Sequence, residues 1–280
     1  MTRRWLAVLA VLATATAWGA TFPLVKNVVE RMSPEAFIAA RFTLAGVILT
    51  IAARRSLTRA LLRPGILLGL LVFAGYEMQT HGLITISASR SAFLTGLYVV
   101  LVPFFQWRTT GRPRLHVWLA SILAVIGTTV LIGGGFSARP TIGDLLTLAC
   151  AFAFAWHVVL SARHSTNETS TALAAIQVLA VGLLATPLTL FTRPTPWDTQ
   201  IVAVILFTAI VTTAIAFAAL MWGQAHVTAT EAAVILAFEP VAAAITSIAF
   251  EGEPFTVPFA IGAALILGAM LLSQMNFGVR

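Results

Sequence analysis

A carboxylic acid lies deep inside an apolar stretch of the chain at Glu239, about ten residues, or roughly 15 Å of helix, from the nearest polar connection. Ionisable side chains in such stretches cost free energy and mark substrate or ion pathways. Glu239 could take up a proton or bind a substrate ammonium group. Alternatively, a protonated Glu239 bonds a backbone carbonyl that the following Pro240 leaves free. Tyr98 lies at a matching depth in another apolar stretch, either facing a cavity or packed with its hydroxyl satisfied.

A second group of polar residues lies in two neighbouring apolar stretches. Arg41 and Glu77 are each seven residues from the same end of their stretches. A buried ion pair between them avoids two isolated charges in a low dielectric, so we predict a structural pair or, alternatively, two residues that meet a zwitterion. His81 shares a helix face with Glu77. This stretch is therefore expected to line a cavity, and Glu77, His81 and Glu239 permit proton coupling.

Two tryptophans, Trp18 and Trp156, match when the chain is compared with itself at a shift of 138 residues, and His157 follows the second. Aromatic rings deep in a span can stack on a planar or apolar substrate, or they can simply pack against other helices. Trp18, Trp156 and His157 therefore join Glu77, His81, Tyr98 and Glu239 as candidate substrate-binding residues.

Prolines inside the apolar stretches, among them Pro23 and Pro240, interrupt helix hydrogen bonds and allow a membrane helix to bend. Trp222 lies toward one end of its stretch, where a bulky ring could close a pathway. Together with Arg41, these residues form a candidate structural or gating set.

The elements that hold these side chains follow from composition. The 280 residues are 59% hydrophobic and only 10% charged, whereas a soluble domain carries about 25% charged residues. Since a spanning helix needs about 20 apolar residues, the sequence predicts an all-α integral membrane protein with ten transmembrane helices. The expected spans are about 5–29, 34–53, 64–84, 88–107, 115–134, 143–163, 170–191, 198–222, 229–249 and 256–275.

The net charge of +7 comes largely from arginines in the connections between spans. If the N-terminus is cytoplasmic, eleven lysines and arginines fall on the cytoplasmic side and five on the other, with Arg41 left out of the count. This bias predicts a multi-pass protein of the inner membrane with both termini cytoplasmic. It also explains the basic composition without a nucleic-acid partner.

The chain repeats itself at a shift of 141 residues. This shift places Gly82 on Gly223, Ala88 on Ala229 and Tyr98 on Glu239. We therefore predict an N-terminal repeat at 1–137 and a C-terminal repeat at 138–280, each with five spans. Because five is odd, the second repeat enters the membrane from the opposite side, so the basic connection at 108–114 corresponds to an acidic one with Glu251 and Glu253. Inverted repeats are typical of secondary transporters.

The sequence lacks the common catalytic and cofactor-binding motifs. The sequence contains no phosphate-binding G-x-x-x-x-G-K-[ST], no H-E-x-x-H and no G-x-S-x-G. The single cysteine, Cys150, lies in an apolar run, and no Cys/His cluster indicates a metal site. We therefore expect no enzyme activity, no catalytic residues, no metal and no cofactor.

Several segments resemble the EamA-type transporters of the drug/metabolite transporter superfamily. They are W-G-A-T-F-P-L-V-K at 18–26, S-P-E-A-F-I-A-A-R-F at 33–42, G-L-I-T-I-S-A-S-R-S-A-F-L-T-G-L-Y at 82–98, T-A-T-E-A-A-V-I-L-A-F-E-P at 228–240 and E-G-E-P at 251–254. The resemblance covers the whole chain and implies ten helices in inverted halves and the export of amino acids or related metabolites. The first half departs from the pattern, because Val99 stands where the second half has Pro240.

Taken together, the residues and the resemblance favour a secondary transporter that exports small metabolites by alternating access. Amino acids, among them aromatic or apolar ones, are the preferred substrate class, because a cavity with both charges and aromatic rings suits a zwitterion. The alternative on the same scaffold is a cationic or neutral drug-like substrate. A third hypothesis, an intramembrane enzyme or sensory module, finds no nucleophile–base pair or output domain. Because one chain supplies both halves, a functional monomer is plausible.

Overall fold

The computed structural model describes residues 3–109, 111–131, 140–192, 197–246, 248–249 and 255–275. Within these ranges the chain is almost entirely helical and contains no strand. The elements are α1 (Arg3–Val29), α2 (Pro34–Ala53), α3 (Arg59–Thr85), α4 (Ala88–Gly96), α5 (Tyr98–Thr109), α6 (Leu115–Leu131), α7 (Ile142–His164), α8 (Ser170–Ala185), η1 (Thr186–Phe191), α9 (Thr199–Phe207), η2 (Thr208–Ile215), α10 (Ala216–Gln224), α11 (Ala229–Leu236), α12 (Glu239–Thr246) and α13 (Val257–Gln274).

Eight segments of the described chain are long and apolar enough to cross a membrane. Some combine consecutive elements: α8 continues into the 3₁₀ turn η1, and α9 and α10 are joined by the π-helical segment η2. A shorter apolar helix, α6, and the interrupted pair α4–α5 occupy the places of two further predicted spans. The protein is therefore an all-α membrane protein, and the count of ten spans stays a prediction.

Two helices are interrupted at positions that the repeat relates. The break between α4 and α5 falls at Leu97, and the break between α11 and α12 falls at Ala237 and Phe238. Under the 141-residue shift, α4 and α11 also begin at equivalent residues, after the N-caps Ser87 and Thr228, whose hydroxyls accept backbone hydrogen bonds. Tyr98 and Glu239 are thus the first residues after the two breaks.

Pro240 consequently occupies a different place from the one expected. It is the second residue of α12, where a proline sacrifices no intrahelical hydrogen bond, so it begins a new helix rather than bending a continuous one. Pro23, by contrast, lies inside α1. The first half breaks its helix without a proline, since Val99 stands within α5.

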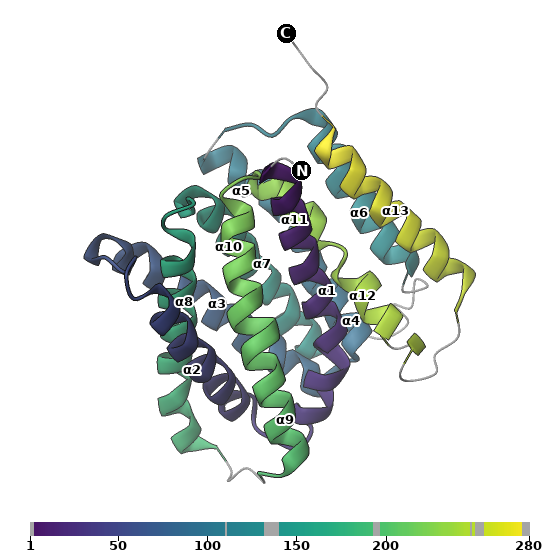
Figure 1. Cartoon of the computed structure of the whole chain (residues 1–280). Helices are drawn as coiled ribbons and strands as arrows, with labels where there is room; N and C mark the ends of the chain where they lie inside the picture. The colour runs from purple at the N-terminus through teal and green to yellow at the C-terminus, as the bar shows by residue number, and fades with distance from the viewer. Residues whose placement is uncertain are drawn as a thin grey trace.

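The interrupted helices pack across the two halves of the chain. The first helix, α1, lies along α11 and α12, while α7, which begins the second half, lies along α4 and α5 (Figure 1). α2 packs on α8, α3 on α7 and α8, and α6 pairs with α13 at one edge of the molecule. The pairing of α6 with α13 is close because Gly127 and Gly262 meet there, where an added Cβ on either would lie less than 3 Å from the other's carbonyl oxygen.

Some predictions fall on parts of the chain outside the described residues. These are the boundary between the repeats at 137 and 138, the acidic connection with Glu251 and Glu253, and three of the arginines in the charge count, Arg139, Arg193 and Arg280. The division into repeats at that boundary therefore stays a prediction.

Candidate functional site

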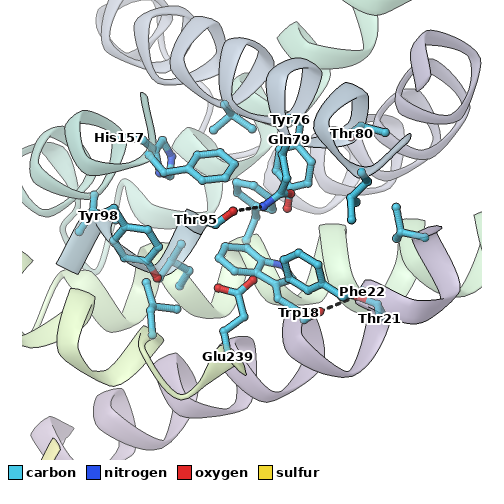
Figure 2. Close-up of a pocket in the computed structure, with 18 of the residues that line it drawn as sticks. Trp18, Thr21, Phe22, Tyr76, Gln79, Thr80, Thr95, Tyr98, His157 and Glu239 are labelled. Carbon is cyan, nitrogen blue, oxygen red and sulfur yellow. Dashed lines mark hydrogen bonds between the residues drawn. The ribbon is translucent and has the colours of Figure 1, made fainter. Parts of the chain in front are cut away.

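A small cavity lies where the interrupted helices meet the long ones (Figure 2). Its volume of about 50 Å³ holds only a few water molecules, so any larger substrate requires it to widen. Its walls come from α1, α3, α4, α5, α7, α10, α11 and α12, and from α2 through Arg41. The lining residues are Trp18, Thr21, Phe22, Val25, Arg41, Val72, Tyr76, Gln79, Thr80, Leu83, Thr95, Tyr98, Phe154, His157, Val158, Phe217, Leu220, Leu236 and Glu239.

Glu239 contributes the carboxylate of this cavity. The residue is 5% exposed, and its side chain points into the space beside Trp18 (Figure 2). Among the described residues, the carboxylate makes no hydrogen bond, which leaves both oxygens for a ligand or a proton. The alternative in which Glu239 bonds a backbone carbonyl freed by Pro240 is not found in this part of the chain. A buried carboxylate without a partner is costly, so Glu239 stays a candidate for binding a substrate or a proton.

Arg41 contributes the cation, but its surroundings differ from the prediction. The expected ion pair with Glu77 is wrong within the described residues. Instead, Arg41 Nε donates to Thr213 Oγ1 at 2.6 Å, and Nη2 donates to Thr212 Oγ1 at 3.0 Å and to its carbonyl at 3.2 Å. The guanidinium also lies 5.3–5.8 Å from three ring centroids, those of Phe37, Phe42 and Tyr76, where cation–π attraction helps to replace lost hydration.

The π-helical segment η2 explains how a backbone carbonyl becomes available to Arg41. Widened π-helical turns disturb the regular i to i−4 ladder and are frequent at functional sites. The Thr212 carbonyl accepts from Trp18 Nε1 at 2.7 Å as well as from Arg41. The Thr212 carbonyl oxygen thus holds both the Trp18 ring and the Arg41 guanidinium in position.

Aromatic rings form much of the remaining wall. Trp18 packs against Phe217 with centroids 5.5 Å apart, and Tyr76 contacts Phe42 and Phe154 edge-on at 4.9 and 5.5 Å. These tilted arrangements are the favoured geometry for ring pairs. The walls are therefore apolar and rigid around a small number of polar groups.

Gln79, Thr95 and His157 are further polar side chains of the cavity, and each bonds to a protein partner. Gln79 Nε2 donates to Thr95 Oγ1 at 2.9 Å. His157 Nε2 lies 2.6 Å from the Gln177 side-chain amide and 3.2 Å from Ser161 Oγ. These hydrogen bonds hold the side chains in place. Among the described lining residues, Glu239 is the carboxylate that remains without a hydrogen-bond partner.

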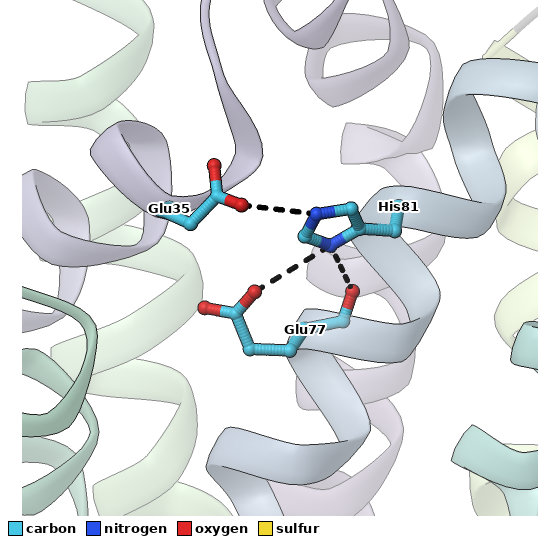
Figure 3. Close-up of side chains that lie close together, drawn as sticks. All are labelled: Glu35, Glu77 and His81. Atoms are coloured by element: carbon cyan, nitrogen blue, oxygen red, sulfur yellow. Dashed lines mark hydrogen bonds and ion pairs between the residues drawn. The ribbon is translucent and has the colours of Figure 1, made fainter. Parts of the chain in front are cut away.

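Glu77 and His81 lie outside the cavity, in a triad with Glu35 at the start of α2 (Figure 3). His81 Nδ1 is 2.8 Å from the Glu77 carbonyl and 3.5 Å from its carboxylate, while Nε2 is 3.0 Å from Glu35 Oε1. One donor atom from each residue lies within 4.8 Å of the others, and this set also suits a divalent metal. Hydrogen bonding accounts for the same arrangement, and the residues do not line the candidate site.

Trp156 and Trp222 also lie away from the cavity. Trp156 stacks on Phe105 of α5 with centroids 4.5 Å apart and planes 13° apart, facing a groove on the other side of α7. Trp222 contacts His226, which bonds to the Trp222 carbonyl at 2.9 Å. The predicted equivalence of Trp18 and Trp156 therefore does not produce a symmetrical pair of cavity rings.

Residues that were not selected from the sequence complete the site. Tyr76, Thr95 and Phe217 line the cavity with the candidates. Tyr76 had a detectable signal, because the chain has only two tyrosines and the other, Tyr98, was selected for its depth. Thr95 and Phe217 had none, since threonine and phenylalanine are common throughout the spans.

A small, aromatic-walled cavity between interrupted membrane helices from two halves of a chain is typical of transporters built from internal repeats. The chain belongs to the EamA-like transporter family, which matches it twice, at residues 5–133 and 141–275. The resemblance to EamA-type drug/metabolite transporters is thereby confirmed.

Similar proteins carry the same broad description. A protein of Archaeoglobus fulgidus described as an uncharacterized transporter is 33% identical over 98% of this chain and 87% of its own length. The uncharacterized transporter YwfM of Bacillus subtilis is 24% identical over 94% and 92%, and the uncharacterized inner membrane transporter YicL of Salmonella typhimurium is 24% identical over 95% and 94%. A crystal structure of another protein shares the fold, with a TM-score of 0.83 over 97% of this chain and 98% of that one at 21% identity.

Proposed function

We propose that this transporter exports amino acids across the inner membrane, with both termini in the cytoplasm, by alternating access of its two halves. The observation that carries the proposal is the buried Glu239 carboxylate, which has no hydrogen-bond partner among the described residues, in an aromatic cavity that also presents Arg41. A substrate ammonium group would satisfy Glu239, and a substrate carboxylate would add a charge-assisted contact to Arg41. The rings around them suit an apolar or aromatic side chain.

Flux through proteoliposomes tests the substrate class. The protein is reconstituted and exposed to a panel of labelled amino acids, with and without a pH gradient. We expect saturable flux of one group of amino acids, lost by at least tenfold in Glu239→Gln, since a charge-assisted hydrogen bond contributes about 1.5–3 kcal/mol. Glu30→Gln serves as a matched control, because Glu30 is an exposed glutamate just after α1 that pairs with Lys26 and lies outside the cavity. Folded protein that moves no amino acid contradicts the proposal.

One observation favours a second candidate, a cationic substrate. Two nitrogens of Arg41 already donate to Thr212 and Thr213, and three rings surround its guanidinium. On this alternative, Arg41 is structural and Glu239 alone recognises the substrate. Arg41→Lys and Arg41→Ala separate the two: zwitterion export falls more than cation export if Arg41 binds a carboxylate, whereas an equal loss for both supports a structural role.

Proton coupling would follow from the same carboxylate. If Glu239 alternately binds a proton and the substrate amine, an inward proton gradient drives export, and Glu239→Gln removes the dependence on that gradient. Flux that is equal with and without the gradient instead supports a facilitator.

A further inference from the structure

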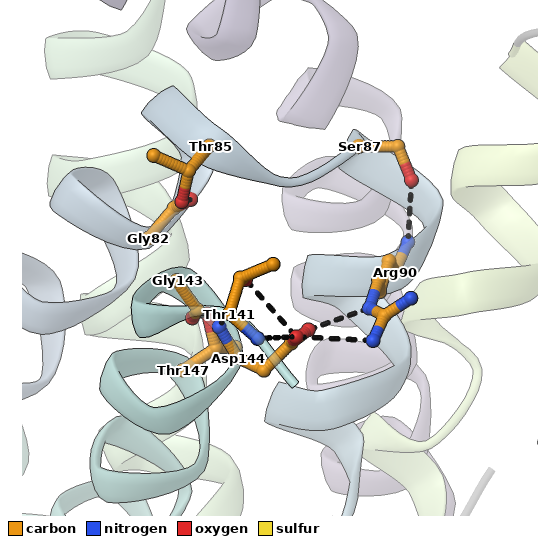
Figure 4. Close-up of polar contacts among 8 residues, drawn as sticks. All are labelled: Gly82, Thr85, Ser87, Arg90, Thr141, Gly143, Asp144 and Thr147. Carbon is orange, nitrogen blue, oxygen red and sulfur yellow. Dashed lines mark hydrogen bonds and ion pairs between the residues drawn. The ribbon is translucent and has the colours of Figure 1, made fainter. Parts of the chain in front are cut away.

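Among the ion pairs that join the halves of the described chain, two link the start of a helix in one half to the start of a helix in the other, and they lie on opposite faces of the molecule. On the face where α1 begins, Arg4 Nη2 is 2.8 Å from Glu231 Oε1. On the opposite face, Arg90 bonds Asp144 through Nε–Oδ1 at 2.5 Å and Nη2–Oδ2 at 3.0 Å (Figure 4). Each pair connects an interrupted helix of one half to the first helix of the other half: α11 to α1, and α4 to α7.

The two pairs occupy equivalent positions with opposite charges. Arg90 is the third residue of α4 and Glu231 is the third residue of α11, and the 141-residue shift places one on the other. Their partners, Asp144 and Arg4, lie in the first turns of α7 and α1. An ion pair therefore occurs at equivalent positions in both halves, but the acidic and the basic residue have exchanged places.

Each carboxylate is held by hydrogen bonds at the start of its own helix, independently of its arginine partner. Asp144 accepts from the Thr141 backbone nitrogen at 2.7 Å, and Glu231 accepts from the Thr228 backbone nitrogen at 2.8 Å, so both complete capping boxes at the starts of their helices. Their side chains are only 6% and 10% exposed. Because capping removes their rotational freedom, each carboxylate is a preorganised anchor, and the arginine is the part that can release.

We propose that Arg90–Asp144 and Arg4–Glu231 are the two gates of the transport pathway, each closing the cavity toward one face and each breaking when that face opens. Both pairs are formed in this structure, which agrees with a cavity too small for a metabolite. The inference rests on alternating access in the proposed function but is independent of substrate class.

Each face also carries a second contact between the halves: a pair of hydrogen bonds on one face and an exposed ion pair on the other. Gln106 Oε1, on α5, accepts from the backbone nitrogen and hydroxyl of Thr230 at 2.9 and 2.7 Å beside the Arg4 gate. On the opposite face, Arg31 pairs with Asp198, but both side chains are about 40% exposed, and such pairs contribute little in water. The gate of Arg90 and Asp144 is bidentate and more buried, so it is the stronger of the two.

Cysteine accessibility tests the gates without a substrate. In a Cys150→Ala background, Thr80→Cys places a thiol on the cavity wall. A membrane-impermeant maleimide is applied from either side, using intact cells and inside-out vesicles. We expect Arg90→Gln to raise labelling about tenfold from one side only, and Arg4→Gln to raise it from the other, a factor that corresponds to about 1.4 kcal/mol.

Matched controls separate gating from general loosening. Arg55→Gln removes an exposed arginine from the α2–α3 connection, and Glu30→Gln removes an exposed glutamate that pairs with Lys26 at the end of α1; neither should change labelling. Arg90→Lys and Arg4→Lys keep the charge and should give intermediate rates even if a glutamine variant folds poorly. Unchanged labelling in folded gate variants, or a rise from the same side for both, overturns the proposal. Sided labelling without any amino-acid flux would reject the substrate class and keep the gates.

Discussion

The closest approach of backbones beside the candidate site gives a sharp prediction about Gly19. A Cβ added at Gly19 of α1 would lie 2.1 Å from the Glu239 carbonyl oxygen, 2.8 Å from Ala242 Cβ and 3.0 Å from the Ala243 nitrogen. Two of these atoms belong to the backbone of α12, so no rotamer change can relieve the overlap. Gly19→Ala must therefore push α1 and α12 apart by about 1 Å or more, given ordinary contacts near 3.5 Å.

The cost can be bounded from the same geometry. Overpacking of a well-packed interior costs about 1–3 kcal/mol, occasionally more, and the gain in helix propensity from glycine to alanine returns at most about 1 kcal/mol. We expect a net destabilisation of about 1–2 kcal/mol. Because the displaced backbone carries Glu239, and a displacement of about 1 Å can cost a hundredfold in a positioned site, transport should fall much more than stability.

Thermal unfolding in detergent and flux in proteoliposomes measure the two effects. The matched control is Gly268→Ala in α13, where the nearest atom to an added Cβ is Leu123 Cδ2 at 4.0 Å. That variant should be neutral or more stable by up to about 1 kcal/mol, with normal flux. If Gly19→Ala retains both the stability and the flux of the parent, the close packing of α1 on α12 does not position Glu239 and the reasoning fails.

Three other perturbations test separate parts of the structure. Trp18→Phe keeps a ring in the wall but removes the hydrogen bond to Thr212, so we expect a loss of about 0.5–1.5 kcal/mol in stability or substrate affinity. Unfolding and the KM of flux measure these two quantities, and if neither changes, the bond does not contribute as inferred. Glu35→Gln weakens the triad at His81 outside the cavity, so the melting temperature should fall while the KM stays within twofold, and a large rise in KM would place the triad in the pathway. Cys150 is fully buried, so native protein should resist thiol reagents until it unfolds, and rapid labelling of the folded protein would contradict this packing.

The depth of side chains could be predicted from the sequence, but their direction around the helix could not. Tyr98 and Glu239 were placed together by the internal shift, and both line the cavity. Arg41 and Glu77 matched equally well in depth, yet Tyr76 rather than Glu77 faces Arg41. Consecutive residues of an α-helix point about 100° apart, so an error of one position sends a side chain to a different neighbour.

Trp156 and His157 repeat the same lesson within a single helix. Both were selected for a site, but His157 faces the cavity and Trp156 faces Phe105 on the other side of α7. The hydrophobic pattern cannot resolve the choice, because a membrane helix is apolar toward lipid and toward its neighbours alike. The gate pairs could not be predicted from the sequence either. The shift aligns Arg90 with Glu231, but their partners depend on which helix starts meet in space.

The charge reversal between the gates bears on how the halves can move. An arginine at 231, copied from Arg90 alone, would face Arg4 and repel it. A reversed pair on this face therefore needs a change at both of its residues. Glu231 and Arg4 supply such a change together, and the capping boxes at Thr141 and Thr228 keep each acid in place. Because the bidentate pair at Arg90 is more buried than the pair at Arg4, opening at the Arg4 face costs less free energy, and we expect the substrate-free protein to open there more often.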